Sequence, residues 1–219
     1  MVHLYALTEH PANLPHVRGI GATPLASAAL GAIDAIFSEI DGDSAEPTES
    51  AILAHAHVVD EVARINDAVL PARLARPYEN ELALLAAVRD RDVQFRAALD
   101  RVRGCVEMGV RVLRKTNGNE ADTPSGSQYM RSRLTSVKLA ETVADELDEA
   151  VSGLTRDALP GVTGTRELVL TVSYLLARED GGSFRAAVET VASDRPDLSY
   201  VCVGPWPAYS FALVDGGAS

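Results

Sequence analysis

A small number of residues in this sequence have the types and spacing that chemistry requires. His57 and Glu61 lie four residues apart, so on a helix their side chains would share one face and could supply two ligands to a metal ion. His55 would point to a different face, and the sequence offers no third ligand nearby. A place on the surface or in the packing of a helix is therefore the preferred interpretation, and no metal is expected.

Two further patterns suggest chemistry that the sequence does not complete. Gly19-Ile20-Gly21-Ala22-Thr23 is similar to the start of a phosphate-binding loop, but it lacks a third glycine and the helix that should follow. Glu107 could exchange protons, yet no motif links it to a second carboxylate or a nucleophile, so we expect an acid on a solvent-facing strand surface. The sequence contains no nucleophile elbow, cysteine-histidine signature or zinc-ligand spacing. We therefore predict that the protein has no catalytic residue, binds no cofactor and is not an enzyme.

The C-terminal octet, Gly204-Pro205-Trp206-Pro207-Ala208-Tyr209-Ser210-Phe211, concentrates rigid and aromatic residues. Each proline fixes its own φ and restricts the residue before it, so the only tryptophan of the chain is held between two rigid points and the segment cannot be helical. Such a segment could close the end of a hydrophobic core, or it could be a docking surface whose shape costs little entropy to keep. The residues alone leave both interpretations open.

Composition narrows the class of protein. The chain has 219 residues, 47% of them hydrophobic and 23% charged, which is typical of a folded protein of one large domain or two small ones. A net charge of −11 argues against a nucleic-acid partner and against an anionic membrane surface. No apolar stretch is long enough to span a bilayer, and no signal peptide opens the sequence, so we expect a cytoplasmic protein whose two cysteines, Cys105 and Cys202, are reduced thiols.

The elements that must position these residues begin with strands. The first part of the chain is expected to hold a buried strand, a loop rich in proline and glycine, a second strand, a helix capped by Thr48, an edge strand interrupted by Pro71, and a helical segment broken near its middle. These elements are expected at residues 2–7, 8–28, 30–40, 48–67, 69–74 and 78–102, with the break near 90–92. We expect Ile52, Ala56, Val59 and Ala63 to turn the first helix toward the sheet.

The second part of the chain follows a different order. We expect a half-exposed strand, a polar segment, one long helix, a strand, a helix and two last strands joined by the octet, at residues 104–113, 115–127, 128–156, 166–177, 184–193, 198–203 and 209–214. Apolar residues of the long helix form a near-heptad seam, which could serve a coiled-coil partner but which we expect to pack on its own sheet: Val137, Ala140, Ala144, Leu147, Val151 and Leu154. The predicted fold class is α+β with two domains, an N-terminal α/β domain over 1–103 and a modified ferredoxin-like domain with a long helix over 104–219.

The octet resembles the terminal signature of the gas vesicle protein GvpF/GvpL family, whose members are accessory proteins of gas-filled protein organelles. Further matches follow in the family's order along the chain: Tyr5 in the opening strand, Leu70-Pro71-x-Arg73, Gly104-x-x-Glu107-x-Gly109-Val110, Gly126-x-x-Tyr129 and Tyr174-Leu175. Ala208 stands where the family usually has a proline, and Leu74 where it has an aromatic residue. The order and spacing of these motifs extend the resemblance over most of the chain.

The resemblance implies a minor structural or accessory protein of the gas vesicle, which binds the small shell protein and helps to initiate vesicle assembly. It implies the shell protein and other accessory proteins as partners, and a place in the cytoplasm or at the vesicle. The candidate contact residues are those of the octet, namely Gly204, Pro205, Trp206, Pro207, Tyr209 and Phe211. The alternative is a small-molecule-binding regulatory or enzymatic ferredoxin-like domain, which a deep polar pocket would favour.

Overall fold

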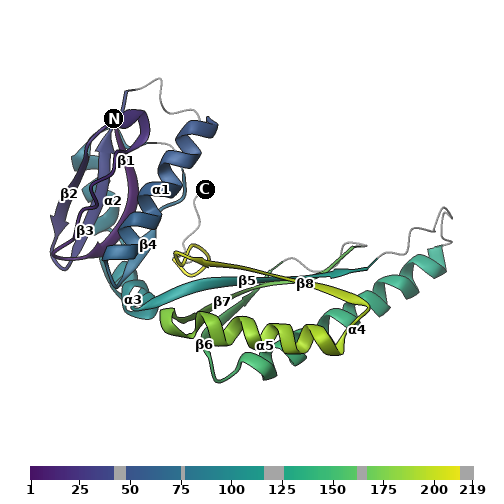
Figure 1. The fold of residues 1–219 in the computed structure, drawn as a ribbon. Helices are drawn as coiled ribbons and strands as arrows, with labels where there is room; N and C mark the ends of the chain where they lie inside the picture. The colour runs from purple at the N-terminus through teal and green to yellow at the C-terminus, as the bar shows by residue number, and fades with distance from the viewer. Residues whose placement is uncertain (42–47, 75–76, 116–125, 162–166, 213–219) are drawn as a thin grey trace. The chain divides into compact units, whose positions relative to one another are not determined.

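The computed structural model describes residues 1–41, 48–74, 77–115, 126–161 and 167–212 (Figure 1). The chain divides into two compact units. The first unit consists of Met1–Cys105 together with the segment that begins at Trp206, and the second unit is Val106–Pro205. The fold class is α+β, with one four-stranded sheet in the first part of the chain and one in the second.

The sheet of the first unit has the strand order β2-β3-β1-β4, and all three pairs are antiparallel. Its strands are β1 (Val2–Glu9), β2 (Leu25–Leu30), β3 (Ile33–Glu39) and β4 (Val69–Pro71). The strand predicted over 30–40 is confirmed as β3, which begins three residues later than predicted. The loop predicted over 8–28 is wrong at its end, because β2 begins at Leu25 and forms a hairpin with β3 that reverses at Gly31, whose φ of +64° suits glycine. β4 lies at the edge of the sheet, as Pro71 predicted.

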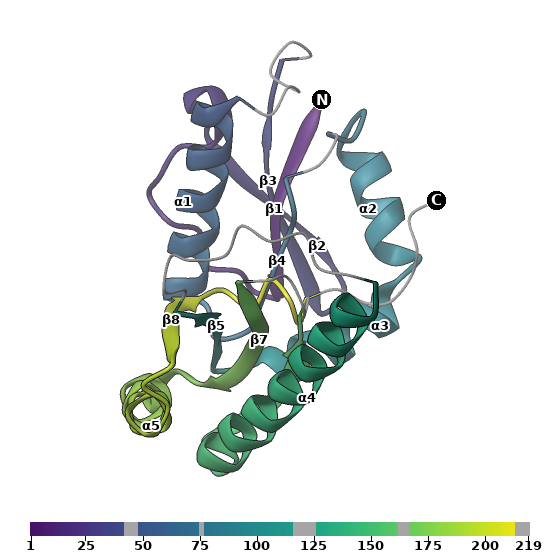
Figure 2. The same cartoon turned by 90° about the vertical axis from the view of Figure 1, so that its right-hand side faces the viewer.

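Helices cover both faces of this sheet. α1 (Glu49–Ile65) lies on one face, and α2 (Glu81–Arg89) and α3 (Asp92–Val102) lie on the other (Figure 2). Thr48 caps α1 as predicted, since its side-chain oxygen accepts a hydrogen bond from the backbone N–H of Ala51, and the predicted break near 90–92 separates α2 from α3. The predicted inner face of α1 is wrong in one respect, because Ile52 is exposed; the buried residues are Ala51, His55, Val58, Val59 and Val62.

The sheet of the second unit has the strand order β6-β7-β5-β8, and α4 and α5 both lie on one of its faces (Figure 1). The elements run β5 (Cys105–Arg114), α4 (Gly126–Val151), β6 (Thr155–Pro160), β7 (Leu168–Ala177), a short 3₁₀ helix η3 (Arg178–Asp180), α5 (Gly181–Asp194) and β8 (Leu198–Trp206). The long helix therefore ends earlier than predicted, and β6 follows it where no strand was expected. Most of the predicted polar segment over 115–127 lies outside the described residues.

The core of the second unit lies between this sheet and its two helices. β5 contributes the alternating residues Val106, Met108, Val110 and Val112, which confirms the predicted inner face of that strand. From the seam of α4, Ala140, Leu147 and Val151 are buried in the core, and Ala144 and Leu154 are partly buried against it. Val137, at the N-terminal end of the predicted seam, is exposed instead.

Candidate partner-binding site

The octet begins at the end of β8, where Gly204 occupies a position that only glycine fits. Its φ is +106°, and an added Cβ would lie 2.7 Å from the carbonyl oxygen of Glu107 and 3.1 Å from Sδ of Met108. The peptide bond from Gly204 to Pro205 is cis. Gly109 allows a second close approach, since an added Cβ there would lie 2.9 Å from Cγ2 of Val203. Both glycines thus bring β5 and β8 together.

A side chain from α5 fixes the same strand end. Nη1 of Arg185 donates to the carbonyl oxygen of Cys202 at 3.3 Å, and Nη2 donates to the carbonyl oxygen of Gly204. These two carbonyls are two residues apart, so they lie on the same edge of the strand. A charged donor satisfies both of them, which fixes the position of the backbone just before Pro205.

The prediction that Glu107 lies on a solvent-facing strand surface is wrong. Its side chain is buried, with 5% of its surface exposed. Strand alternation correctly placed Glu107 on the face opposite Val106 and Met108. That face of the sheet, however, need not be exposed to solvent. A carboxylate in this position belongs to the packing around β5, and no described group of three potential metal ligands includes it.

Trp206 is the exposed aromatic residue of the octet, with 50% of its surface accessible to solvent. Pro205 before it is exposed as well, whereas Pro207 after it is partly buried. The indole therefore does not close a core. A large aromatic ring that is left half exposed is a feature expected of a protein-binding surface.

The rest of the octet turns inward and packs within the first unit. The backbone N–H groups of Phe211 and Ala212 both donate to the carbonyl oxygen of Ala208, at 3.2 and 2.9 Å, and this turn buries the side chains of Ala208 and Phe211. The guanidinium of Arg101 lies 5.4 Å from the centre of the Phe211 ring. The strand predicted over 209–214 is thus absent from its described part, residues 209–212.

Tyr209 is partly buried against the core that includes Val58 and Val62 of α1. Burial, and secondarily the charge of Asp60, raises the pKa of the Tyr209 hydroxyl to about 12. The two interpretations of the octet, closure of a core and docking of a partner, therefore apply to different residues. Ala208, Tyr209 and Phe211 pack into the molecule, while Pro205 and Trp206 remain available to a partner.

A buried pair of histidines in the first unit was not predicted. Nε2 of His3 lies 2.8 Å from Nδ1 of His55, and Nε2 of His55 lies 2.9 Å from the carbonyl oxygen of Ala72. A carbonyl can only accept, so His55 carries its proton on Nε2 and its Nδ1 accepts from His3. Burial, with the neighbouring His55 second, lowers the pKa of His3 to about 4, and burial also lowers the pKa of His55.

This pair gives His55 a packing role and leaves it no lone pair for a metal. His57 is exposed, and Glu61 accepts hydrogen bonds from Nε and Nη2 of Arg64 at 3.2 and 2.7 Å. The two-ligand metal site considered at His57 and Glu61 is therefore an ordinary helix surface. The pairing of His3 with His55 joins residues 52 positions apart, and no local pattern in the sequence could have indicated it.

The glycine-rich segment near residue 20 packs against the side chain of Tyr5. The hydroxyl of Tyr5 accepts a hydrogen bond from the backbone N–H of Ile20 at 2.8 Å and lies 2.9 Å from Oγ of Ser38. A Cβ added at Gly19 would lie 2.3 Å from this hydroxyl, so glycine is needed there to make room for Tyr5. The N–H of Ile20 that a phosphate would require is therefore already engaged by the protein.

The remaining motif positions lie at structural points of the chain. Leu70 and Pro71 are buried in β4, Arg73 after it is exposed, and Gly104 has a φ of +68° just before β5. Gly126 and Tyr129 lie in the first turn of α4, but their side-chain environment falls outside the described residues. Cys105 and Cys202 are not joined by a disulfide, and the Cys105 thiol donates to the carbonyl oxygen of Arg103.

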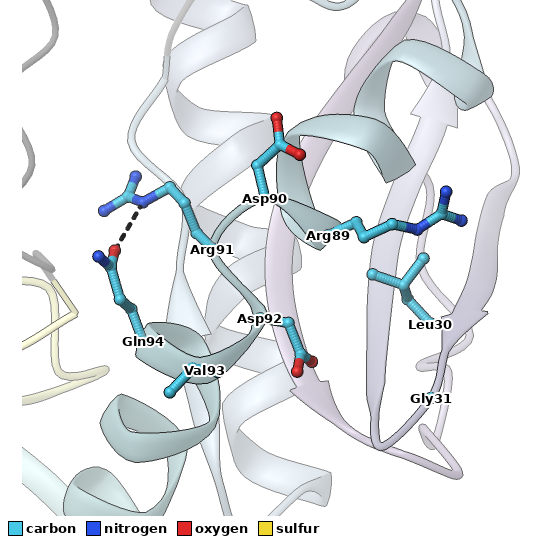
Figure 3. A pocket seen from close by; sticks show the side chains of 8 residues that line it. All are labelled: Leu30, Gly31, Arg89, Asp90, Arg91, Asp92, Val93 and Gln94. Atoms are coloured by element: carbon cyan, nitrogen blue, oxygen red, sulfur yellow. Dashed lines mark hydrogen bonds between the residues drawn. The ribbon is translucent and has the colours of Figure 1, made fainter.

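A surface hollow of about 630 Å³ lies in the first unit, between the β2–β3 hairpin and the junction of α2 with α3 (Figure 3). It is lined by Leu30, Gly31, Arg89, Asp90, Arg91, Asp92, Val93 and Gln94. Its charged side chains spread apart instead of converging: Arg91 turns away from the hairpin and donates to Oε1 of Gln94, and Asp92 pairs with Arg96 at 2.7 Å. This arrangement does not favour the small-molecule alternative.

No helix among the described residues is both long and apolar enough to cross a membrane. The fold and the geometry of the octet thus define an α+β protein in which the exposed Pro205 and Trp206 form the candidate site.

A family model for the gas vesicle synthesis protein GvpL/GvpF matches residues 1–213, and the chain belongs to this family. It is 26% identical to gas vesicle protein F2 of Halobacterium salinarum over 222 residues, which cover 99% of this chain and 94% of that protein. It is 28% identical to gas vesicle protein L of Streptomyces sp. (strain CB03234) over 248 residues, which cover 96% of this chain and 92% of that protein. The resemblance seen in the motifs is thereby confirmed.

Solved structures share the fold. The crystal structure of gas vesicle protein GvpF from Anabaena sp. PCC7120 superposes with a TM-score of 0.81 at 14% identity, covering 100% of this chain and 98% of that one. That of GvpF from Microcystis aeruginosa superposes with a TM-score of 0.79 at 12% identity, covering 97% and 99% of the two chains. The same fold is therefore reached with few identical residues.

Proposed function

We propose that this chain is a non-enzymatic accessory protein of the gas vesicle, which binds the small shell protein in the cytoplasm and helps to initiate vesicle assembly. Membership of the GvpL/GvpF family supplies the gas vesicle context. The observation that carries the proposed binding role is the half-exposed ring of Trp206, which directly precedes a segment that packs into the first unit.

The energetics of Trp206 favour a contact with a partner. Covering the exposed half of the indole would remove on the order of 100 Å² from water, which would stabilise a complex by about 2–3 kcal/mol. Little entropy would be lost on binding, because the turn at Ala208, in the same unit as Trp206, is held by its own hydrogen bonds. A fixed aromatic residue of this kind is typical of the few side chains that dominate binding energy.

We also propose that the chain has two domains and that the second is ferredoxin-like. Support comes from the β-α-β-β-α-β order from β5 to β8, combined with the strand order β6-β7-β5-β8. The predicted boundary after residue 103 lies close to the start of the second compact unit at Val106. The segment from Trp206 onward groups with the first unit, so we assign it to the N-terminal domain.

The binding role is tested by retaining the purified full chain on a resin that carries the shell protein. Trp206→Ala should lose most of the retention, because it removes the exposed ring and keeps the buried residues of the octet. Leu82→Ala is the matched control, since Leu82 is also a large exposed apolar residue, with 78% of its surface accessible. Equal retention of the two variants would refute a contact at Trp206, and no retention of the wild type would refute shell-protein binding.

A further inference from the structure

The N-terminal half of α4 carries an apolar stripe that nothing in the described structure covers. Met130, Leu134 and Val137 are 58%, 61% and 48% exposed. Their spacings of four and three residues place them on one side of the helix. Figure 1 shows this end of α4 reaching past the strands of its own unit, and Ala140 is the first buried residue among the helix positions whose burial is described. Within the described residues, the stripe is therefore an uncovered helix face that lies outside the core.

Cations border this stripe. Arg131, Arg133 and Lys138 are exposed, and no acidic residue occurs from Gly126 to Ala140. At about 100° per residue, Arg133 lies to one side of the stripe, and Arg131 and Lys138 lie to the other. The sign reverses further along the helix, where the acids Glu141, Asp145, Glu146, Asp148 and Glu149 follow. In a chain of net charge −11, this short segment is a local positive region.

We propose that the face formed by Met130, Leu134 and Val137, with its bordering cations, binds an amphipathic helix whose apolar side is flanked by carboxylates. A ridge of residues spaced i, i+4, i+7 fits between the side chains of a second helix. Acids beside the partner's apolar side would meet Arg131 and Lys138, which would set its register and speed its association. None of these residues belongs to the octet, so this proposal does not depend on the role of Trp206.

Charge also argues against two other occupants. In a second copy of this chain, the same face would bring a second set of three cations against the first, and like charges at close range disfavour that pairing. An anionic lipid surface would attract the three cations but repel the acidic remainder of the molecule. Three aliphatic residues would in addition bury little area in a bilayer.

The probe for this surface is a fluorescently labelled synthetic helical peptide of about 18 residues, with leucine along one side and glutamate bordering it. A matched peptide carries lysine in place of each glutamate. With the full-length protein, fluorescence anisotropy should show tighter binding of the glutamate peptide, and its affinity should fall as salt is added. Leu134→Ser/Val137→Ser and, separately, Arg131→Glu/Lys138→Glu should each weaken the binding by about tenfold or more.

Leu82→Ser is the control, because it removes a more exposed leucine from α2 and should leave the peptide affinity unchanged. All the substituted positions are exposed, so the folded state should persist, and circular dichroism checks this. The proposal fails if both peptides bind equally, if neither binds, or if the α4 variants keep the wild-type affinity. Stronger binding to vesicles of anionic lipid than to the glutamate peptide, or dimerisation that Leu134→Ser/Val137→Ser abolishes, would also overturn it.

Discussion

Gly204 connects the chemistry of a single residue to the position of Trp206. Its positive φ and the 2.7 Å approach to the carbonyl oxygen of Glu107 leave no space for a side chain. Gly204→Ala should therefore lower the free energy of unfolding by about 2–4 kcal/mol, measured by urea denaturation. Gly153→Ala is the control, because a Cβ there would meet no atom within 4 Å. Equal stability of the two variants would contradict the steric account.

The histidine pair makes stability depend on pH. The pKa of His3 is lowered from 6.5 to about 4 in the folded chain, and the pKa of His55 is lowered too, so the unfolded chain takes up protons first as the pH falls. The contribution of the neutral histidine pair to the free energy of unfolding is complete above about pH 6.5 and is lost as the pH falls toward 4. For His3 this loss should reach roughly 3 kcal/mol.

Denaturant titrations between these two pH values, with wild type, His3→Gln and His57→Gln, test this prediction. Glutamine keeps a donor that can reach Nδ1 of His55 but does not ionise in this range, so His3→Gln should reduce the dependence on pH. His57→Gln should leave it unchanged, because His57 is exposed on α1. A His3→Gln variant that loses stability as steeply as the wild type would show that the pair does not titrate as described.

At the scale of elements, the C-terminal segment is held by buried residues and presents an exposed one. Phe211 is 1% exposed and packs under Arg101, so Phe211→Ala should lower the free energy of unfolding by about 3–5 kcal/mol. Trp206→Ala should lower it by about 1 kcal/mol or less, because half of the ring already lies in water. Thermal unfolding followed by circular dichroism measures both, and a larger loss for Trp206→Ala would assign the tryptophan to the core.

Helices and strands with a strong local sequence signal could be predicted, and those that depend on contacts with distant parts of the chain could not. α1 was indicated by its cap at Thr48, and β5 by its alternating valines. β6 has the sequence Thr-Arg-Asp-Ala-Leu-Pro, a half-exposed edge strand with a register shift after Thr155, and its polar residues carry no alternation to detect. Tyr209 and Phe211 suggested a strand by their spacing, but the buried positions are Ala208 and Phe211, three residues apart, as in a turn.

At the scale of the whole molecule, the family could be predicted because its motifs occur in order along the chain, and the roles of those motifs could not. Tyr5, Gly109 and Gly204 proved to be points of close packing, which no local pattern distinguishes from points of contact with a partner. The division of the octet into buried and exposed residues depends on where the chain turns after Trp206. That turn combines the local hydrogen bonds to Ala208 with the burial of Phe211 beneath Arg101, a residue distant in the sequence.

The central claim, that the shell protein covers Trp206, can be measured directly because the chain has a single tryptophan. The full-length protein is titrated with shell protein whose own tryptophans are replaced by phenylalanine, and the emission spectrum is recorded together with a separate measure of binding. The indole is half exposed at the start, so covering it should shift its emission to the blue and protect it from a soluble quencher, in proportion to the complex formed. Binding that leaves both the emission and the quenching of Trp206 unchanged would contradict the account.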